Sequence, residues 1–266
     1  MDYDKDGRLD FVSGSYDLGE VFWFRNLGKA SGGNVRFEAA AMLFDVEGMP
    51  LVHHTDQWRE YARLRKEVGE ADPATTTAKV ANYGSFPMPI DFDGDGDLDM
   101  LIGSLGGGVY LRETVPHRAK GKRTPVPGFA PTAVPLVADG VPLQVHSHAD
   151  PFAADWDGDG RWDLVVGAGD GSVGWYRNVG TVEAPQFGAR QELVAPKSTT
   201  DQVKRSFDEQ GRPQPGTRAQ ICVADYDGDG RVDLLVGDYG TGEAGKQART
   251  SYVWLYLRSG PITPGR

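Results

Sequence analysis

The sequence predicts an all-β fold made of repeated four-stranded units, the architecture of a β-propeller, and three observations support this prediction. The 266 residues include 36 glycines and 17 prolines, which suit short strands joined by tight turns. An aspartate-rich loop occurs four times along the chain. Each copy is followed by an apolar run and then by an aromatic run, as expected for consecutive strands of one sheet. Internal repetition of this kind is typical of repeat architectures.

The four loops share aspartates at positions 1, 3, 5 and 9 and a glycine at position 6. They span residues 2–10, 91–99, 155–163 and 225–233, and their starts lie 89, 64 and 70 residues apart. A strand is predicted directly after each loop, at residues 11–14, 100–103, 164–167 and 234–237. A second strand is predicted after the next turn, at residues 21–25, 109–112, 173–177 and 253–258. Further strands at residues 191–195 and 220–224 bring the unit to about four strands, which is the size of a propeller blade.

We therefore expect one propeller domain over residues 1–266, with repeats near residues 1–43, 84–114, 146–195 and 217–260 and insertions at 44–83 and 115–145. Four visible blades would either close a four-bladed ring or form part of a larger one. The first insertion has a helical pattern near residues 56–69, because apolar residues recur there at spacings of three and four, with Asp56 placed to cap the start and Gly69 the end. Four prolines between residues 125 and 135 predict an irregular loop.

The loop pattern favours calcium as its ligand. Calcium takes six to eight oxygen ligands, and carboxylates at positions 1, 3 and 5 can converge on one ion where a glycine permits a sharp turn. A backbone carbonyl at position 7 and the aspartate at position 9 would complete the shell. An EF-hand is disfavoured, because its closing glutamate at position 12 would fall inside the apolar strand. The expected ligands are Asp2, Asp4, Asp6, Arg8 and Asp10; Asp91, Asp93, Asp95, Asp97 and Asp99; Asp155, Asp157, Asp159, Arg161 and Asp163; and Asp225, Asp227, Asp229, Arg231 and Asp233.

Up to four Ca²⁺ ions are therefore expected. The alternative is a set of aspartate turns without metal, but four carboxylates gathered in each of four loops would repel strongly without a cation. The formal net charge of −10 argues against nucleic acid as a partner, and four divalent cations would bring it to about −2. No apolar run is long enough to span a membrane. The single cysteine, Cys222, lies in an apolar run and is predicted to be buried.

The loops and their strands resemble the FG-GAP/VCBS repeat family, which includes the propeller of integrin α-subunits. The resemblance rests on the Asp-x-Asp-x-Asp-Gly-x-x-Asp loop followed by Asp-Leu-Leu-Val-Gly at residues 233–237, and on Asn-Val-Gly-Thr at 178–181 with Pro-Gln-Phe at 185–187. It covers the chain outside residues 44–83 and 115–145. It implies a calcium-binding propeller whose host proteins include adhesins, other cell-surface proteins and some polysaccharide lyases. Propellers of this kind usually have about seven blades, so the four repeats either close a four-bladed ring or belong to a larger ring with further blades outside this chain.

Two classes of function follow, together with a purely structural role in a larger assembly. The preferred one is a secreted, cell-surface or periplasmic module that binds a glycan or a protein, where extracellular calcium fills weak sites. Met1 is followed at once by Asp2, so we expect a truncated N-terminus and see no signal peptide. Aromatic residues that could stack on sugar rings are Trp58, Tyr61, Tyr83 and Tyr239.

The alternative is a polysaccharide lyase or hydrolase. Four of the five histidines form two close pairs, and His146 and His148 would point the same way on a strand. Together they could form a zinc site or hold a general base beside a tyrosine. The candidate catalytic residues are His53, His54, His146, His148, Tyr61 and Tyr83. No serine–histidine–aspartate pattern or phosphate loop is present, so binding without catalysis is the preferred interpretation.

Overall fold

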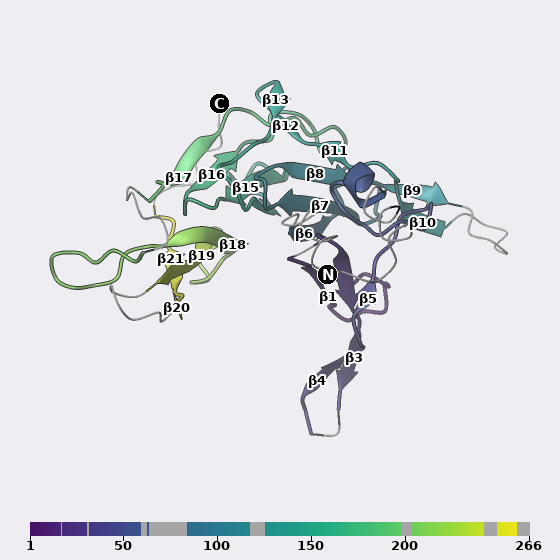
Figure 1. Ribbon diagram of the computed structural model, residues 1–266, viewed down its shortest axis with the longest axis horizontal. Helices are drawn as coiled ribbons and strands as arrows, with labels where there is room; N and C mark the ends of the chain where they lie inside the picture. Colours follow the sequence, from purple (N-terminus) through teal and green to yellow (C-terminus); the bar gives the residue numbers. More distant parts are fainter. Residues whose placement is uncertain are drawn as a thin grey trace. The chain divides into compact units, whose positions relative to one another are not determined.

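The computed structural model describes residues 1–16, 18–30, 32–59, 63, 84–117, 126–197, 204–241 and 249–259. The chain divides into two compact units. The first comprises Met1–Leu105 and Tyr110–Pro135, and the second Gly106–Val109 and Leu136–Arg266. Both are built from antiparallel sheets, with almost no helix in the described part of the chain (Figure 1). None of the helical segments described is long and apolar enough to cross a membrane.

The first unit contains a three-stranded sheet of order β1-β2-β5 and a four-stranded sheet of order β11-β8-β7-β6. Two hairpins, β3–β4 and β9–β10, stand outside these sheets, and the first of them projects away from β1 and β2 (Figure 1). The strands are β1 (Phe11–Gly14), β2 (Val21–Phe24), β3 (Asn26–Lys29), β4 (Val35–Phe37), β5 (Ala41–Met42), β6 (Ser85–Ile90), β7 (Asp99–Ser104), β8 (Val109–Arg112), β9 (Thr114–His117), β10 (Val126–Phe129) and β11 (Val134–Pro135).

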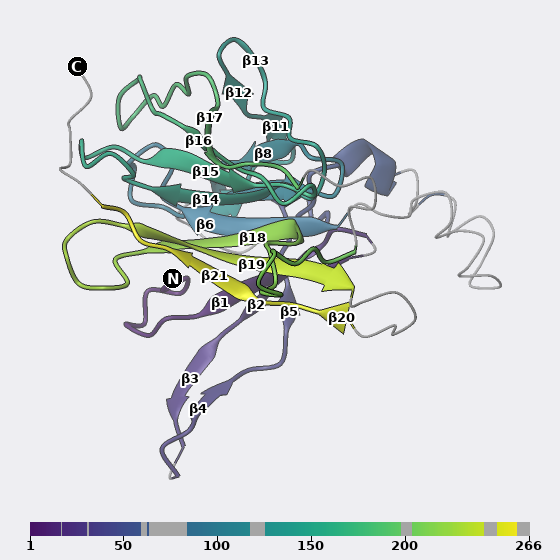
Figure 2. The ribbon, with the colours of Figure 1, turned by 90° about the vertical axis from the view of Figure 1, so that its left-hand side faces the viewer.

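The second unit contains two further sheets, and in each the strands follow one another in antiparallel order (Figure 2). The first has the order β14-β15-β16-β17. In the second, β19 pairs with β18 on one side and with β20 and β21 on the other. A short hairpin, β12–β13, precedes them. The strands are β12 (Val137–Ala138), β13 (Val141–Pro142), β14 (Asp150–Ala154), β15 (Asp163–Gly167), β16 (Val173–Tyr176), β17 (Gln191–Val194), β18 (Thr217–Ala224), β19 (Asp233–Thr241), β20 (Arg249–Thr250) and β21 (Val253–Tyr256).

Each unit has its own apolar core between neighbouring sheets. In the second unit Val165 on β15, Val223 on β18 and Val236 on β19 are buried in one cluster. In the first unit Val21, Met100 and Ile102 form the equivalent cluster with Leu51. β7 and β15 are buried along their whole length, which explains why their sequences read as continuous apolar runs rather than alternating ones.

A glycine at the end of the strand after the loop lets neighbouring sheets approach closely. A Cβ atom on Gly167 would lie 2.2 Å from the carbonyl oxygen of Ala219, which begins the next sheet. A Cβ atom on Gly14 would likewise lie 2.0 Å from the carbonyl oxygen of Ser85. The sheets are also joined there by backbone hydrogen bonds, such as Ala219 N–H to the carbonyl of Ala168 at 3.0 Å. At Gly14 and Gly167 the glycine of the repeat is therefore a packing requirement.

The all-β prediction is confirmed, and strands occur at every predicted position after a loop. The prediction of an irregular loop at residues 125–135 is wrong, because β10 and β11 lie there. β11 is an edge strand of the sheet β11-β8-β7-β6. Pro127 on β10 faces Pro116 on β9 in a two-stranded ribbon, where a missing N–H is tolerated. Residues 55–59 and 63 are helical, and the rest of the predicted 56–69 helix lies outside the described residues. Cys222 is exposed, contrary to prediction, because alternation along β18 puts it on the face opposite Val223.

Candidate metal centres and histidine clusters

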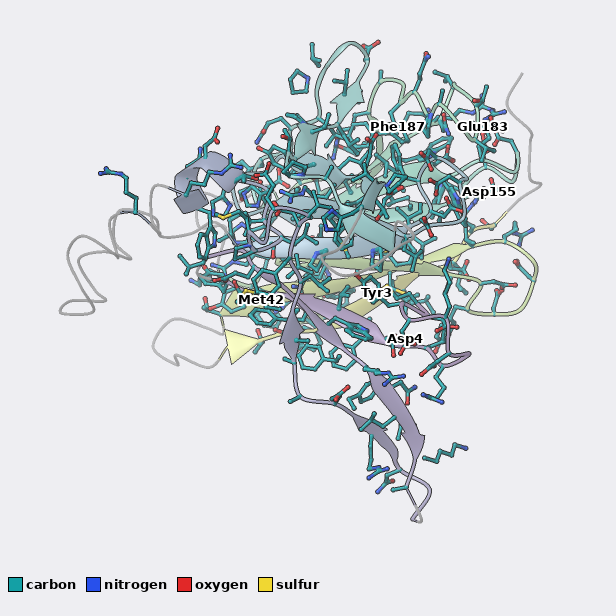
Figure 3. All side chains as sticks on the ribbon, turned by 90° about the vertical axis from the view of Figure 1, so that its right-hand side faces the viewer. Tyr3, Asp4, Met42, Asp155, Glu183 and Phe187 are labelled. Carbon is teal, nitrogen blue, oxygen red and sulfur yellow. The ribbon has the colours of Figure 1, made fainter. Side chains whose placement is uncertain are left out.

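The four aspartate loops each bring three carboxylates together. In every loop one oxygen from each of the aspartates at positions 1, 3 and 5 lies within 4.8 Å of the other two. Loops two to four join the first and second strands of their sheets, and the first loop leads into β1. Figure 3 labels Asp4 of the first loop and Asp155 of the third. The structure therefore gathers the predicted side-chain ligands at positions 1, 3 and 5 into four equivalent triads.

The aspartate at position 1 shapes the loop around itself. In the third loop Asp155 accepts the N–H groups of Asp159 and Gly160, both at 2.9 Å. Asp2 and Asp225 accept the matching pairs in the first and fourth loops. The glycine at position 6 has a φ of +84 to +89° in all four loops, a conformation that glycine adopts at no steric cost. The loop is folded by its own hydrogen bonds.

In the first and third loops the aspartate at position 3 has a buried carboxylate oxygen that accepts no hydrogen bond from the described residues. Asp157 is 6% exposed, and its Oδ1 atom accepts no hydrogen bond in the described part of the chain. The Oδ1 atom of Asp4, at position 3 of the first loop, is also buried without a donor among the described residues, and so is the Oδ1 atom of Asp91, at position 1 of the second loop. A buried carboxylate oxygen without a donor is costly, and a cation among three carboxylates would satisfy it. The donor set, all oxygen and negatively charged, fits a hard divalent cation such as calcium.

Arginines already compensate part of this charge in three loops: the position 7 arginines Arg8, Arg161 and Arg231 pair with the position 5 aspartates, and a further arginine contributes in the first and third loops. The Nε atom of Arg177 lies 2.6 Å from Asp157 Oδ2, and its Nη2 atom lies 3.1 Å from Asp159. Arg25 makes the matching contacts with Asp4 and Asp6. Arg25 follows β2 directly, and Arg177 follows β16 directly. The ion pairs of the two arginines show that the carboxylates of the loops attract positive charge. The two arginines were not predicted from the sequence, because each lies about 20 residues from its aspartates.

The aspartate at position 9 has a different role from the triad. In the third loop Asp163 is fully buried; its Oδ2 accepts the N–H of Trp156 at 3.2 Å, and its Oδ1 accepts the N–H of Asn178 at 2.7 Å. Asp10, Asp99 and Asp233 make the same two bonds in their own repeats. Each of these aspartates therefore joins the start of its loop to the segment that follows β2, β8, β16 or β21. As metal ligands they stay predictions, as do the position 7 carbonyls.

Burial and crowding of carboxylates perturb the position 9 groups. Burial raises the pKa of Asp99 to about 6, and the charges of Asp93 and Asp95 add to this effect, against the two backbone N–H groups that lower it. Burial likewise raises the pKa of Asp163. In Asp233 the hydrogen bond from the N–H of Arg258 dominates and lowers the pKa. Neighbouring aspartates therefore add to the effect of burial on the pKa of Asp99 and Asp163, whereas hydrogen bonding dominates at Asp233.

The first two loops are linked by residues that break the repeat. Position 4 is glycine in three loops, with φ of +74 to +77°, but in the first loop it is Lys5, with φ of +58°. Position 7 is arginine in three loops but Asp97 in the second. Lys5 Nζ lies 3.2 Å from Asp97 Oδ1 and donates to the carbonyl of Gly96 at 3.2 Å. The two departures form one ion pair, a signal that was present in the sequence alignment of the four loops.

The histidines form two pairs, one in each unit. In the first unit the rings of His53 and His54 lie 4.5 Å apart, and His53 stacks on Tyr110 at 5.2 Å. Burial lowers the pKa of His53 to about 4 and that of His54 to about 3, where the charge of His53 adds to the effect. In the second unit the Nδ1 atoms of His146 and His148 both lie 3.1 Å from Ser147 Oγ.

The other predicted candidates contribute little to these pairs. Tyr61 and Tyr83 lie outside the described residues. Trp58 lies in the short helical segment of residues 55–59 that follows the first pair, and its backbone N–H donates to the carbonyl of His54. Tyr239 lies on β19, with the guanidinium of Arg218 over its ring. A zinc site or a general base shared between the two histidine pairs stays a prediction.

Comparison with known families identifies the repeats. The model of the FG-GAP-like repeat family matches residues 155–236, and that of the FG-GAP repeat matches residues 218–256. The matches cover the third and fourth loops with their sheets. Residues 155–256 therefore contain FG-GAP repeats. FG-GAP repeats suggest a binding module of the adhesion or protein-binding type.

Other comparisons add little. No curated protein matches the chain significantly. Among solved structures, the chain is similar to one chain in the Tc holotoxin pore of Photorhabdus luminescens, with 15% identity and a TM-score of 0.36. The similarity covers 93% of this chain and 9% of that one, so this chain spans less than a tenth of the toxin chain. At this TM-score the similarity supports no argument about fold or function.

Proposed function

We propose that the chain is a calcium-stabilised binding module of a secreted, cell-surface or periplasmic protein, and that it holds a protein or glycan partner. The observation that carries the calcium part is the triad of aspartates repeated in four loops, with a buried position 3 oxygen that lacks a donor within the described residues in the first and third loops. The FG-GAP matches support the binding part. The sheets would be blades of a propeller, either closed by these repeats or completed by blades outside the chain.

In each loop the aspartates at positions 1, 3 and 5 would hold the ion. Calcium is favoured over magnesium, because magnesium demands octahedral geometry and keeps several waters. The ion would supply positive charge to the carboxylates, and the chain's own residues would do the rest. Asp155 and Gly160 hold the loop in shape, while Asp163 ties it to the sheet.

The expected stabilisation follows from mass action. Extracellular calcium modules have dissociation constants of roughly 10⁻⁴–10⁻³ M. A site held at tenfold excess over its dissociation constant adds roughly 1.4 kcal/mol to the free energy of unfolding. For domains of this size that corresponds to a melting temperature about 3–6 °C higher for each site.

The test is thermal unfolding in millimolar calcium and in excess chelator, with bound metal measured on the untreated protein. We expect the melting temperature to fall in chelator. Asp157→Asn should reduce both the bound calcium and the shift, since it removes the buried carboxylate of the third triad. Glu183→Gln is the matched control, because Glu183 is an exposed acid of the same unit outside the loops (Figure 3). Unchanged melting and no bound calcium would refute the calcium part.

A further inference from the structure

The second unit gathers basic side chains at the strand ends away from its aspartate loops. The third loop joins the end of β14 to the start of β15, and Asp150 at the start of β14 pairs with Gly167 at the end of β15. Residues just beyond this pair therefore lie at the opposite end of the sheet. The segment 146–148 precedes β14, and Arg218 lies near the start of β18 in the neighbouring sheet.

Backbone hydrogen bonds bring these segments together through Gly169. The N–H of Gly169 donates to the carbonyl of Ser147 at 2.6 Å, and the N–H of Arg218 donates to the carbonyl of Gly169 at 3.0 Å. A Cβ atom on Gly169 would lie 1.9 Å from Ser147 Oγ, so any other residue would force the Ser147 side chain to move. The Ser147 hydroxyl in turn lies 3.1 Å from both His146 and His148. Two imidazoles, a hydroxyl and an arginine thus share one small area.

The backbone in this area is strained. His148 has a φ of +47° and Arg218 a φ of +55°, both in the left-handed region that side chains with a Cβ rarely adopt. The described part of the chain has two other non-glycine residues with positive φ, Lys5 and Asp139. Strained residues persist where the surrounding structure holds them, and they often mark binding sites. Here two of them are joined through a single glycine.

Arg218 has no carboxylate partner in the described part of the chain. Its guanidinium lies 4.7 Å over the ring of Tyr239, which orients it without neutralising it. Three carboxylates lie on the neighbouring segments, and each has its own donor. Asp150 accepts the N–H of Ile221, Asp170 accepts the N–H of Ser172, and Asp238 forms an ion pair with Arg205. The arginine is therefore available to an outside anion.

The charges of this cluster act on one another. Burial lowers the pKa of His148, and the nearby charges of Arg218 and His146 lower it further. Arg218 carries a positive charge and the two imidazoles can acquire one, and within the described residues Arg218 forms no ion pair with a carboxylate. A bound anion would relieve this repulsion.

We propose that His146, Ser147, His148 and Arg218 form a binding site for a single carboxylate, supplied by an acidic segment of a partner protein. The planar guanidinium matches a carboxylate, and the hydroxyl and imidazoles add further donors. The inference rests on the proposed binding function and names the place and ligand class. A long polyanion is disfavoured, because the chain has a net charge of −10 and the cluster is small. FG-GAP repeats also suggest a protein partner.

The probe is a short blocked peptide with glutamates separated by glycines, compared with the same peptide carrying glutamine. Titration is followed by the histidine ring resonances in NMR, with His148→Asn used to assign its signal. We expect the glutamate peptide to bind and to raise the pKa of His148, and the glutamine peptide to bind at least tenfold more weakly. Arg218→Asn should also weaken binding at least tenfold. Asparagine tolerates positive φ, so both variants should fold.

The matched control is Arg212→Asn, because Arg212 is exposed and already paired with Asp208 in the same unit. It should bind as the unmodified protein does. Equal binding of the two peptides, or equal binding by Arg218→Asn, would overturn the proposal. Tighter, Arg218-dependent binding of heparin would replace the protein partner with an acidic glycan. Repeating the titration in chelator separates the two ideas: binding without calcium-dependent melting would refute only the calcium part of the proposed function.

Discussion

Replacing Gly167 with alanine tests whether the repeat glycine is a packing requirement. Gly167 ends β15, and the added Cβ would lie 2.2 Å from the Ala219 carbonyl oxygen and 3.0 Å from its carbon. Both atoms belong to backbone, so neither can rotate away. The two strands would have to separate by about 1 Å to reach a normal contact distance, which would also stretch the hydrogen bond between Ala219 and Ala168.

The magnitude follows from the geometry. Forcing an extra methyl group into packed structure costs about 1–3 kcal/mol. Replacing glycine by alanine also reduces the freedom of the unfolded chain, which offsets about 0.4–1 kcal/mol of this cost. Gly237→Ala is the matched control, since Gly237 occupies the same repeat position on β19 and its Cβ would meet nothing closer than 3.6 Å. The control should be neutral or slightly stabilising.

The assay is urea unfolding of both variants and the parent in calcium, followed by tryptophan fluorescence and by circular dichroism. We expect Gly167→Ala to have a free energy of unfolding lower than that of Gly237→Ala by about 2 kcal/mol, at similar m-values. Equal midpoints for the two variants would refute the reasoning, because they differ in the backbone contact and share the repeat position.

Three further outcomes are expected, each measured by unfolding. Arg112 is fully buried and paired with Asp45 at 3.0 Å, so Arg112→Met should lower the free energy of unfolding by about 3–5 kcal/mol. Arg59→Met should lower it by less than about 1 kcal/mol, because the ion pair of Arg59 is exposed. Equal losses in the two variants would contradict the argument. Because burial lowers the pKa of His53 to about 4, the unfolded chain binds a proton that the folded chain does not between about pH 6.5 and 4. His53 should therefore account for a loss of about 2 kcal/mol in the first unit from pH 7.5 to 5, in addition to the loss from His54, and His53→Gln should make this slope less steep. Burial raises the pKa of Asp150 to about 7, so the folded chain binds the extra proton between about pH 4 and 7, and the second unit should lose stability as the pH rises across that range; an Asp150→Asn variant with the same slope would contradict this.

The sequence predicted the repeated strands well, because their signal is local. Residues 109–112 were predicted from β-branched and aromatic content and form β8 with the same bounds. The edge strand β11 was missed, because Val134 and Pro135 have no strand pattern and pair with β8 across a long insertion. Cys222 was placed inside because its neighbours are apolar, yet the face that it occupies depends on the register of β18.

The candidate sites were predicted unevenly for a physical reason. Aspartates at positions 1, 3 and 5 could be assigned to one cluster from spacing alone, since a single turn brings them together. The aspartate at position 9 has the same side chain but accepts two N–H groups, one of them from beyond the next strand. A carboxylate that binds backbone and one that binds metal look alike in a sequence. The cluster of His146, Ser147, His148 and Arg218 could not be predicted from the sequence, because it depends on backbone conformation and on the hydrogen bonds that Gly169 makes with Ser147 and Arg218.

The hydrogen bonds of the position 9 aspartates have an evolutionary consequence. Both hydrogen bonds made by Asp163 lie within one repeat, and so do those of its three counterparts. A gene duplication that copies one repeat therefore copies a loop that closes by itself, with no partner needed elsewhere in the chain. Mutations can then replace the carboxylates at positions 1, 3 or 5 in one copy while its strands stay joined. Arrays of such repeats can therefore lengthen, and the carboxylate triad of an individual copy can change, while the fold is kept.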